Sequence, residues 1–102
     1  MGIIDRYDGI EWDDGNVWKN WKKHHVAPYE TEQALRNEPF LEHDPINYFG
    51  TEKRRIVKSR TDSGRYLFIV YTERNGLLRP ICTRPMNQTE RKQYDEHTKT
   101  NP

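Results

Sequence analysis

The sequence predicts an α+β domain in which helices near both ends of the chain pack on a small antiparallel sheet. Two observations predict this class. Segments with helix-capping residues lie before and after a central block, RRIVKSRTDSGRYLFIVYTERNGLLRPICTRP, in which DSG and NG separate apolar runs. Such short turns join antiparallel strands, and helices set apart from strands along the chain are typical of the α+β class. A chain of 102 residues is expected to form one domain over residues 1–102.

The N-terminal segment predicts a leader, a short strand and a helix. Residues 1–9 are expected to be a flexible leader, ahead of a single folded core over residues 10–97. IEWDD is a candidate edge strand. In the segment GNVWKNWKKHH, Asp13 or Asp14 can cap a helix whose last turn is the cationic KKHH, which the helix dipole favours.

A second helix is expected over YETEQALRN, because Pro28 suits a first helical turn and Pro39 follows the segment. Residues 40–52, punctuated by Pro45 and Gly50, predict an irregular connection.

Three strands and a last helix are predicted for the C-terminal half. RRIVKSRT, RYLFIVYTER and LLRPICTRP are the strands, and Pro80 places the third at an edge or at a bulge. NQTERKQYDEH is a helix, because Asn87 and Glu90 have the spacing of a capping box. Residues 98–102 are expected to be a frayed tail.

Composition narrows the functional classes. No apolar run approaches the roughly 20 residues of a membrane span, and no secretory leader is visible. Cys82 is the only cysteine, which excludes an internal disulfide and fits a cytoplasmic protein.

Residues 1–51 contain five Lys/Arg and ten Asp/Glu, whereas residues 52–102 contain twelve Lys/Arg and six Asp/Glu. This asymmetry indicates a basic face for a polyanion, although solvated charge without a partner has the same pattern.

The arginines of the predicted hairpin are the main functional signal. A two-residue Asn-Gly loop sets Thr72 opposite Arg79 and brings Arg74 diagonally near, which forms a cationic cluster at the turn. In this register Glu73 and Arg84 lie on the other face of the sheet, unless the strand is bulged near Pro80. The arginines either bind phosphate, for which the guanidinium fork is suited, or pair individually with acids and solvent. The His and Cys spacing predicts no metal site, and no cofactor motif is present.

Three segments together resemble one family. WDDGNVWKNWKKHHV at 12–26, EKRRIVKSRTDSGRYLFIVYTER at 52–74 and RPICTRPMNQTERKQY at 79–94 are similar to BrnT toxins of bacterial type II toxin–antitoxin systems. The resemblance implies a RelE-like fold and an endoribonuclease that inhibits translation. It also implies a BrnA-like ribbon-helix-helix antitoxin, a heterotetramer of two toxins and two antitoxins, and operator DNA contacted only through the antitoxin. The sequence departs from the family pattern at His24-His25, where His-Gly is usual, and at Cys82-Thr83, where Ser-Ala is usual.

The functional hypothesis is RNA cleavage without a metal or cofactor. Its candidate catalytic residues are His24 or Glu73 as proton shuttle and Arg79 and Arg84 as electrostatic stabilisers. The candidate RNA-binding residues are Lys22, Lys23, Arg60, Arg65 and Arg74. The rival hypothesis is a non-catalytic module that binds nucleic acid or antitoxin and acts as a co-repressor. The nuclease hypothesis requires the guanidinium groups to converge on a groove instead of being neutralised one by one.

Overall fold

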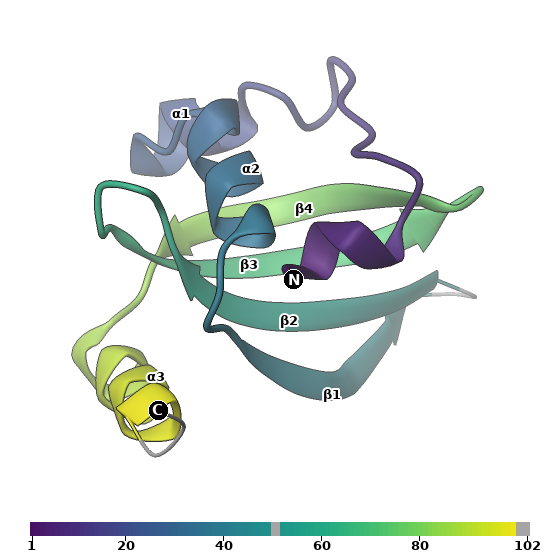
Figure 1. The fold of residues 1–102 in the computed structure, drawn as a ribbon. Helices are drawn as coiled ribbons and strands as arrows, with labels where there is room; N and C mark the ends of the chain where they lie inside the picture. Colours follow the sequence, from purple (N-terminus) through teal and green to yellow (C-terminus); the bar gives the residue numbers. More distant parts are fainter. Residues whose placement is uncertain (50–51, 100–102) are drawn as a thin grey trace.

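The computed structural model describes residues 1–49 and 52–99, and its architecture is a four-stranded antiparallel sheet with helices on both faces (Figure 1). The elements are the 3₁₀-helix η1 (Ile3–Arg6), α1 (Lys19–His24), α2 (Pro28–Arg36), β1 (Leu41–Phe49), β2 (Glu52–Arg60), β3 (Tyr66–Arg74), β4 (Leu77–Pro85) and α3 (Gln88–Lys99). The strands lie in the order β1-β2-β3-β4, each antiparallel to its neighbour. The predicted α+β class is confirmed, and the RelE-like likeness stays a prediction.

One face of the sheet carries the core. Alternate residues of the central strands, among them Val57, Leu67, Ile69 and Tyr71, are fully buried there. The helices η1, α1 and α2 lie over this face (Figure 1). Ile3, Val26, Ala34 and Leu35 complete the apolar cluster from the helical side. Burial of each large apolar side chain contributes about 1.5–3 kcal/mol, so this layer holds the sheet to the helices.

Among the described residues, α3 covers one end of the opposite face (Figure 1). Tyr94 is the buried residue of this helix; its ring meets Tyr66 edge-on at 5.7 Å and its hydroxyl donates to the Pro39 carbonyl at 2.6 Å. Towards the β3–β4 turn, the half-buried side chains of Ile56 and Val70 belong to this second face.

The β3–β4 hairpin follows the predicted register up to a bulge. Asn75 and Gly76 have φ values of 53° and 82°, as a two-residue type I′ turn requires. Thr72 opposes Arg79, but the register then shifts between Val70 and Tyr71. Pro80 still opposes Tyr71, whereas Cys82 opposes Val70, so Ile81 is the extra residue of a β-bulge.

The bulge corrects the predicted face of Arg84. This residue opposes Phe68, which lies on the same side of β3 as Thr72, the partner of Arg79. Arg79 and Arg84 therefore share the second face, and Glu73 alone remains on the core side. Pro80 explains the irregularity, because proline has no N–H for a strand ladder.

The expectation of a flexible leader over residues 1–9 is wrong for its central part. Ile3 is only 1% exposed and belongs to the core cluster. Gly2 is packed so closely that an added Cβ would collide with the Arg36 carbonyl oxygen. Asp5 accepts a hydrogen bond from the Gly2 N–H at 3.0 Å and so closes the first turn of η1.

The expectation of an irregular connection over residues 40–52 is also wrong. Residues 41–49 form β1, which pairs with β2 from Leu41↔Lys58 onward. The register shifts between His43 and Asn47, a stretch that includes Pro45. An edge strand tolerates proline at such an irregularity, because the missing N–H breaks no inner ladder. Gly50 lies outside the described residues.

The remaining elements agree with the predictions except at their ends. The IEWDD segment forms a single bridge, Ile10↔Leu78, instead of a strand. The first helix begins only at Lys19, and Asp13 caps the turn before it by accepting the Gly15 N–H at 2.8 Å.

Pro28 starts α2, as predicted. Asn87 and Glu90 form the predicted capping box, with reciprocal bonds of 2.8 and 2.9 Å. Helix α3 continues to Lys99, into the range expected for a tail; residues 100–102 lie outside the described part.

His25 ends α1 in the left-handed conformation, with φ 54° and ψ 39°. Glycine is the usual residue at this position because a Cβ is disfavoured there. We expect His25→Gly to raise the free energy of unfolding by about 0.5–1 kcal/mol, measured by urea denaturation. His25→Val should lower it, because a β-branched side chain fits this conformation worst. Equal stability of all three proteins would contradict the assignment of strain to His25.

Candidate nucleic-acid interface

A cavity of about 160 Å³ opens at the end of the sheet that carries the β3–β4 turn. We call it the turn-end groove. Its lining combines cations from four separate parts of the chain with the loop before α1: Gly15, Asn16, Lys19, Arg54, Arg74 and Arg79, beside Pro80 and Ile81 of the bulge. The fold therefore brings together Arg74 and Arg79, as the hairpin register predicts. It also adds Lys19 and Arg54, which sequence reasoning missed.

Arg79 is held in a fixed orientation by two carboxylates. Its Nη1 donates to Glu11 Oε1 at 3.0 Å and to Asp13 Oδ2 at 2.7 Å, while Nη2 donates to Asp13 Oδ1 at 3.1 Å. The side chain is 13% exposed. Hydrogen bonding to Asp13 raises the pKa of Arg79, and the same bond lowers the pKa of Asp13, helped by the Gly15 N–H. Arg79 and Asp13 therefore stay charged at neutral pH.

Asn16 connects the acidic loop to the bulge. Its Nδ2 donates to the Pro80 carbonyl at 2.9 Å and to the Glu11 carbonyl at 3.1 Å, and its Oδ1 accepts the Asp13 N–H at 2.8 Å. The side chain is buried. A buried amide with three satisfied bonds is costly to replace, because its partners would lose theirs. Asn16 thereby positions the carboxylates that orient Arg79.

The other cations of the groove come from the surrounding elements. Lys19 is exposed at the start of α1, and its Nζ donates to the Ile81 carbonyl at 3.3 Å. Arg54 comes from β2, and Arg74 is exposed beside the Asn-Gly turn. Arg74 also contributes to lowering the pKa of Asp13, which shows that its charge acts on the same loop. Four cationic side chains thus gather at one groove, beside the carboxylates of Glu11 and Asp13.

Arg84 lies at the other end of the second face. Five strand positions separate it from Arg79, a distance of roughly 16 Å. Its two terminal nitrogens bind the Glu90 carboxylate at 2.8 and 2.9 Å, and its guanidinium lies 4.0 Å from the Phe68 ring centroid. Hydrogen bonding to Arg84 lowers the pKa of Glu90. The two arginines predicted to act together therefore share a face but not a site.

Lys58 is buried beneath α3, near the Arg84–Glu90 pair. It is 4% exposed, and its Nζ donates to Gln93 Oε1 at 2.9 Å. Burial lowers its pKa. The contacts of Lys58, Arg84 and Tyr66 with α3 anchor this polar helix to the sheet.

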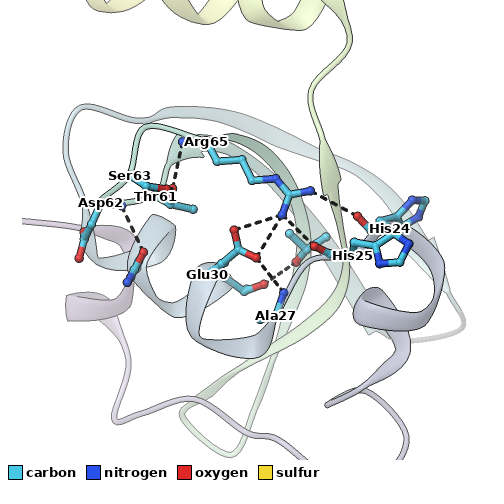
Figure 2. Close-up of polar contacts among 11 residues, drawn as sticks. His24, His25, Ala27, Glu30, Thr61, Asp62, Ser63 and Arg65 are labelled. Carbon is cyan, nitrogen blue, oxygen red and sulfur yellow. Dashed lines mark hydrogen bonds and ion pairs between the residues drawn. The ribbon is translucent and has the colours of Figure 1, made fainter.

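The Arg65 side chain connects α1 and α2 by hydrogen bonds within the fold (Figure 2). Its Nη1 donates to both oxygens of Glu30 at 3.1 Å and to the His25 carbonyl at 2.8 Å, and Nη2 donates to the His24 carbonyl at 3.3 Å. Glu30 in turn accepts the Ala27 N–H at the start of α2. Arg65 therefore caps the end of α1 and pairs with α2, and its guanidinium does not line the turn-end groove.

The other predicted site residues are dispersed. Arg60 stacks on the Tyr66 ring at 4.5 Å and donates to the Gly64 carbonyl, so it lies at the end of β2 away from the turn. His24 is half-buried at the end of α1, and Lys22 and Lys23 are exposed on that helix. Glu73 is exposed, but it lies on the core side of β3. None of these lines the turn-end groove.

Within residues 1–49 and 52–99, no three His, Cys, Asp or Glu side chains gather so that they could hold a metal ion. In the same residues, no helix is long and apolar enough to cross a membrane.

These features define a small α+β protein with a cavity of about 160 Å³ that is lined by four cationic side chains. The family described as ribonuclease toxin, BrnT, of type II toxin–antitoxin systems matches residues 12–90, and the chain belongs to this family. Membership implies an RNA substrate and an antitoxin partner. A search of curated proteins finds no significant match.

Proposed function

We propose that the chain is a metal-independent endoribonuclease that binds the RNA backbone in the turn-end groove. The convergence of Lys19, Arg54, Arg74 and Arg79 on one cavity carries this proposal. The groove gathers charges from elements far apart in sequence, and the guanidinium fork is suited to binding two oxygens of a phosphate. The resemblance to BrnT toxins and the family match support RNA as the polyanion.

The reaction we propose is attack of a ribose 2′-oxygen on the adjacent phosphorus. A base takes the 2′-OH proton, the bond from phosphorus to the 5′-oxygen breaks, and an acid protonates that oxygen. The products are a 2′,3′-cyclic phosphate and a 5′-hydroxyl. Arg79 and Arg74 stabilise the extra negative charge of the phosphorane, and Lys19 and Arg54 hold the neighbouring phosphates. Electrostatic stabilisation of this kind is usually the largest catalytic contribution.

Glu11 is the group we propose as proton acceptor. One of its carboxylate oxygens binds Arg79, whereas Asp13 is engaged through both oxygens. The low pKa of Asp13 also makes it a weak base. The sequence favours His24 or Glu73 for this role; neither they nor Glu11 line the groove, but Glu11 bonds directly to the groove cation Arg79. Asp13 is therefore assigned to orienting Arg79.

We propose the partners that the BrnT resemblance implies. A BrnA-like ribbon-helix-helix antitoxin neutralises the chain in a heterotetramer of two toxins and two antitoxins, and operator DNA is contacted through the antitoxin. Translation is inhibited in the cytoplasm by cleavage of RNA. Sedimentation of the co-expressed pair measures this stoichiometry.

RNA cleavage in the presence of EDTA tests the proposed function. Wild-type protein should cleave RNA equally well with and without the chelator. Arg74→Gln should cleave about tenfold more slowly, because one phosphate contact of about 1.4 kcal/mol is lost. Arg36→Gln is the matched control: it removes one exposed positive charge from α2, away from the groove, and should cleave like wild type.

Two results would contradict this function. RNA that stays intact but bound under all conditions would establish the non-catalytic co-repressor instead. If cleavage required a divalent cation, the proposal of a metal-independent mechanism would be wrong.

A further inference from the structure

Two large aromatic side chains are exposed on α1. Trp18 is 55% exposed and Trp21 is 47% exposed, although indole rings are usually buried for most of their area. The turn-end groove and the core packing do not use either ring. An exposed pair of this size needs a separate explanation.

The backbone puts the two indoles on one side of the helix. The Lys22 N–H donates to the Trp18 carbonyl at 3.1 Å, so Trp18 already belongs to the first helical turn. Residues three and four apart are neighbours on a helix surface, which groups Trp18, Trp21, Lys22 and His25. The His25 ring meets Trp21 edge-on at 5.5 Å. Asn20 is buried and marks the side that faces the protein.

The charged residues of the segment that carries these rings are all cationic. Residues 15–29 contain three lysines and two histidines but no acidic residue, within a half of the chain that holds ten acids. These lysines are three of the five Lys/Arg residues in that half. The indoles therefore lie in a segment suited to a polyanion.

Helix α1 begins at the turn-end groove. Lys19 directly follows Trp18 and lines the groove, where it donates to the Ile81 carbonyl. Helix α1 is about 9 Å long, a length that one or two stacked bases can follow. A strand whose phosphates enter the groove can thus lay its next bases along α1.

We propose that Trp18 and Trp21 are a stacking platform for unpaired bases of the RNA strand bound in the groove. This inference rests on the proposed function and assigns single-stranded RNA as its substrate class. Indole faces bind any base by stacking, and adjacent lysines hold the backbone, as in other single-strand binders. The platform sets where the strand lies relative to Arg79 without reading its sequence.

A protein partner is a poorer fit for this side of α1. Lysine is depleted in protein–protein interfaces, where arginine, methionine and aromatic residues are enriched. Here the three Lys/Arg residues of α1 are all lysines. The two large apolar side chains exposed on this helix are both indoles. The antitoxin is therefore kept as a possible outcome of the test.

Fluorescence anisotropy with two labelled decamers tests the platform. The first probe is 2′-O-methyl RNA, which lacks the attacking hydroxyl and is not cleaved; the second has the same backbone without bases. The double variant W18L/W21L keeps apolar side chains but removes both indoles. It should bind the first probe about tenfold more weakly and the abasic probe like wild type. W18F/W21F keeps aromatic faces and should stay within about threefold of wild type on both.

The groove variant Arg74→Gln separates this inference from the proposed function. It should weaken both probes equally, because it removes a phosphate contact. If Arg74→Gln bound both probes with wild-type affinity, the proposal that RNA binds in the turn-end groove would be refuted. Wild-type affinity of W18L/W21L for the base-carrying probe would refute the platform. Loss of antitoxin binding by W18L/W21L with unchanged RNA affinity would also refute it and make α1 a protein interface.

Discussion

Replacing Arg79 with alanine should lower the rate of RNA cleavage by about 10²–10³-fold, equivalent to about 2.7–4 kcal/mol of transition-state stabilisation. The Arg79 side chain is 13% exposed, whereas Lys19 and Arg74 are exposed, and two carboxylates fix its fork. A preorganised cation needs no reorientation when charge develops on the phosphorane, so its loss affects the chemical step most. Single-turnover cleavage of a labelled RNA measures the effect.

Two variants make this prediction specific. Arg79→Lys keeps the charge but not the fork, and it should recover only part of the activity. Arg84→Ala removes an arginine from the same strand and face that is also paired with a carboxylate. It should cleave far better than Arg79→Ala, because the proposed site lies at the turn end. If a folded Arg84→Ala variant lost as much cleavage activity as Arg79→Ala, the active site would have to lie closer to α3.

Replacing Ile3 with alanine should lower the free energy of unfolding by about 2–4 kcal/mol. The side chain is 1% exposed and packs in the same cluster as Leu35 and Val57. Its truncation leaves a cavity that the surrounding sheet and helix cannot fill. Urea denaturation of the purified variant measures the change.

Tyr29→Ala is the control for this measurement, because Tyr29 is 63% exposed and should change stability by less than about 0.5 kcal/mol. A flexible leader would make the two variants indistinguishable. A change below that limit for Ile3→Ala would restore the sequence-based expectation for residues 1–9.

Local signals in the sequence predict most of the fold. Asn-Gly determines the hairpin because both residues tolerate positive φ, and Pro28 and the Asn87–Glu90 box mark helix starts. These signals act between residues one to three positions apart. For this reason β2, β3, β4, α2 and α3 appear where the sequence predicts them.

Features that depend on distant residues were not predictable in the same way. Ile3 is buried only because α2 and the sheet provide its pocket. Residues 41–49 become a strand because β2 offers a partner edge. The extra residue in β4, Ile81, reverses the face of everything after it, so Arg84 could not be placed from alternation alone.

The candidate site shows the same division. Arg74 and Arg79 meet as their register predicts, because a two-residue turn links their strands. Arg79 and Glu11 are 68 positions apart, and nothing local indicates their ion pair. Lys19 and Arg54 join the groove through packing of α1 on β4 and through sheet order. The sequence therefore indicates the chemistry of the site, but it does not indicate all the residues that form it.

The carboxylates beside Arg79 have a consequence for turnover. A bare group of four cations would attract every polyanion in the cell and would release its products slowly. In the proposed mechanism, Glu11 and Asp13 stay bonded to Arg79 and neutralise part of its charge, so a phosphate group is attracted less strongly than by an unpaired guanidinium. The contacts that align the cation should thereby also speed the release of the cleaved RNA.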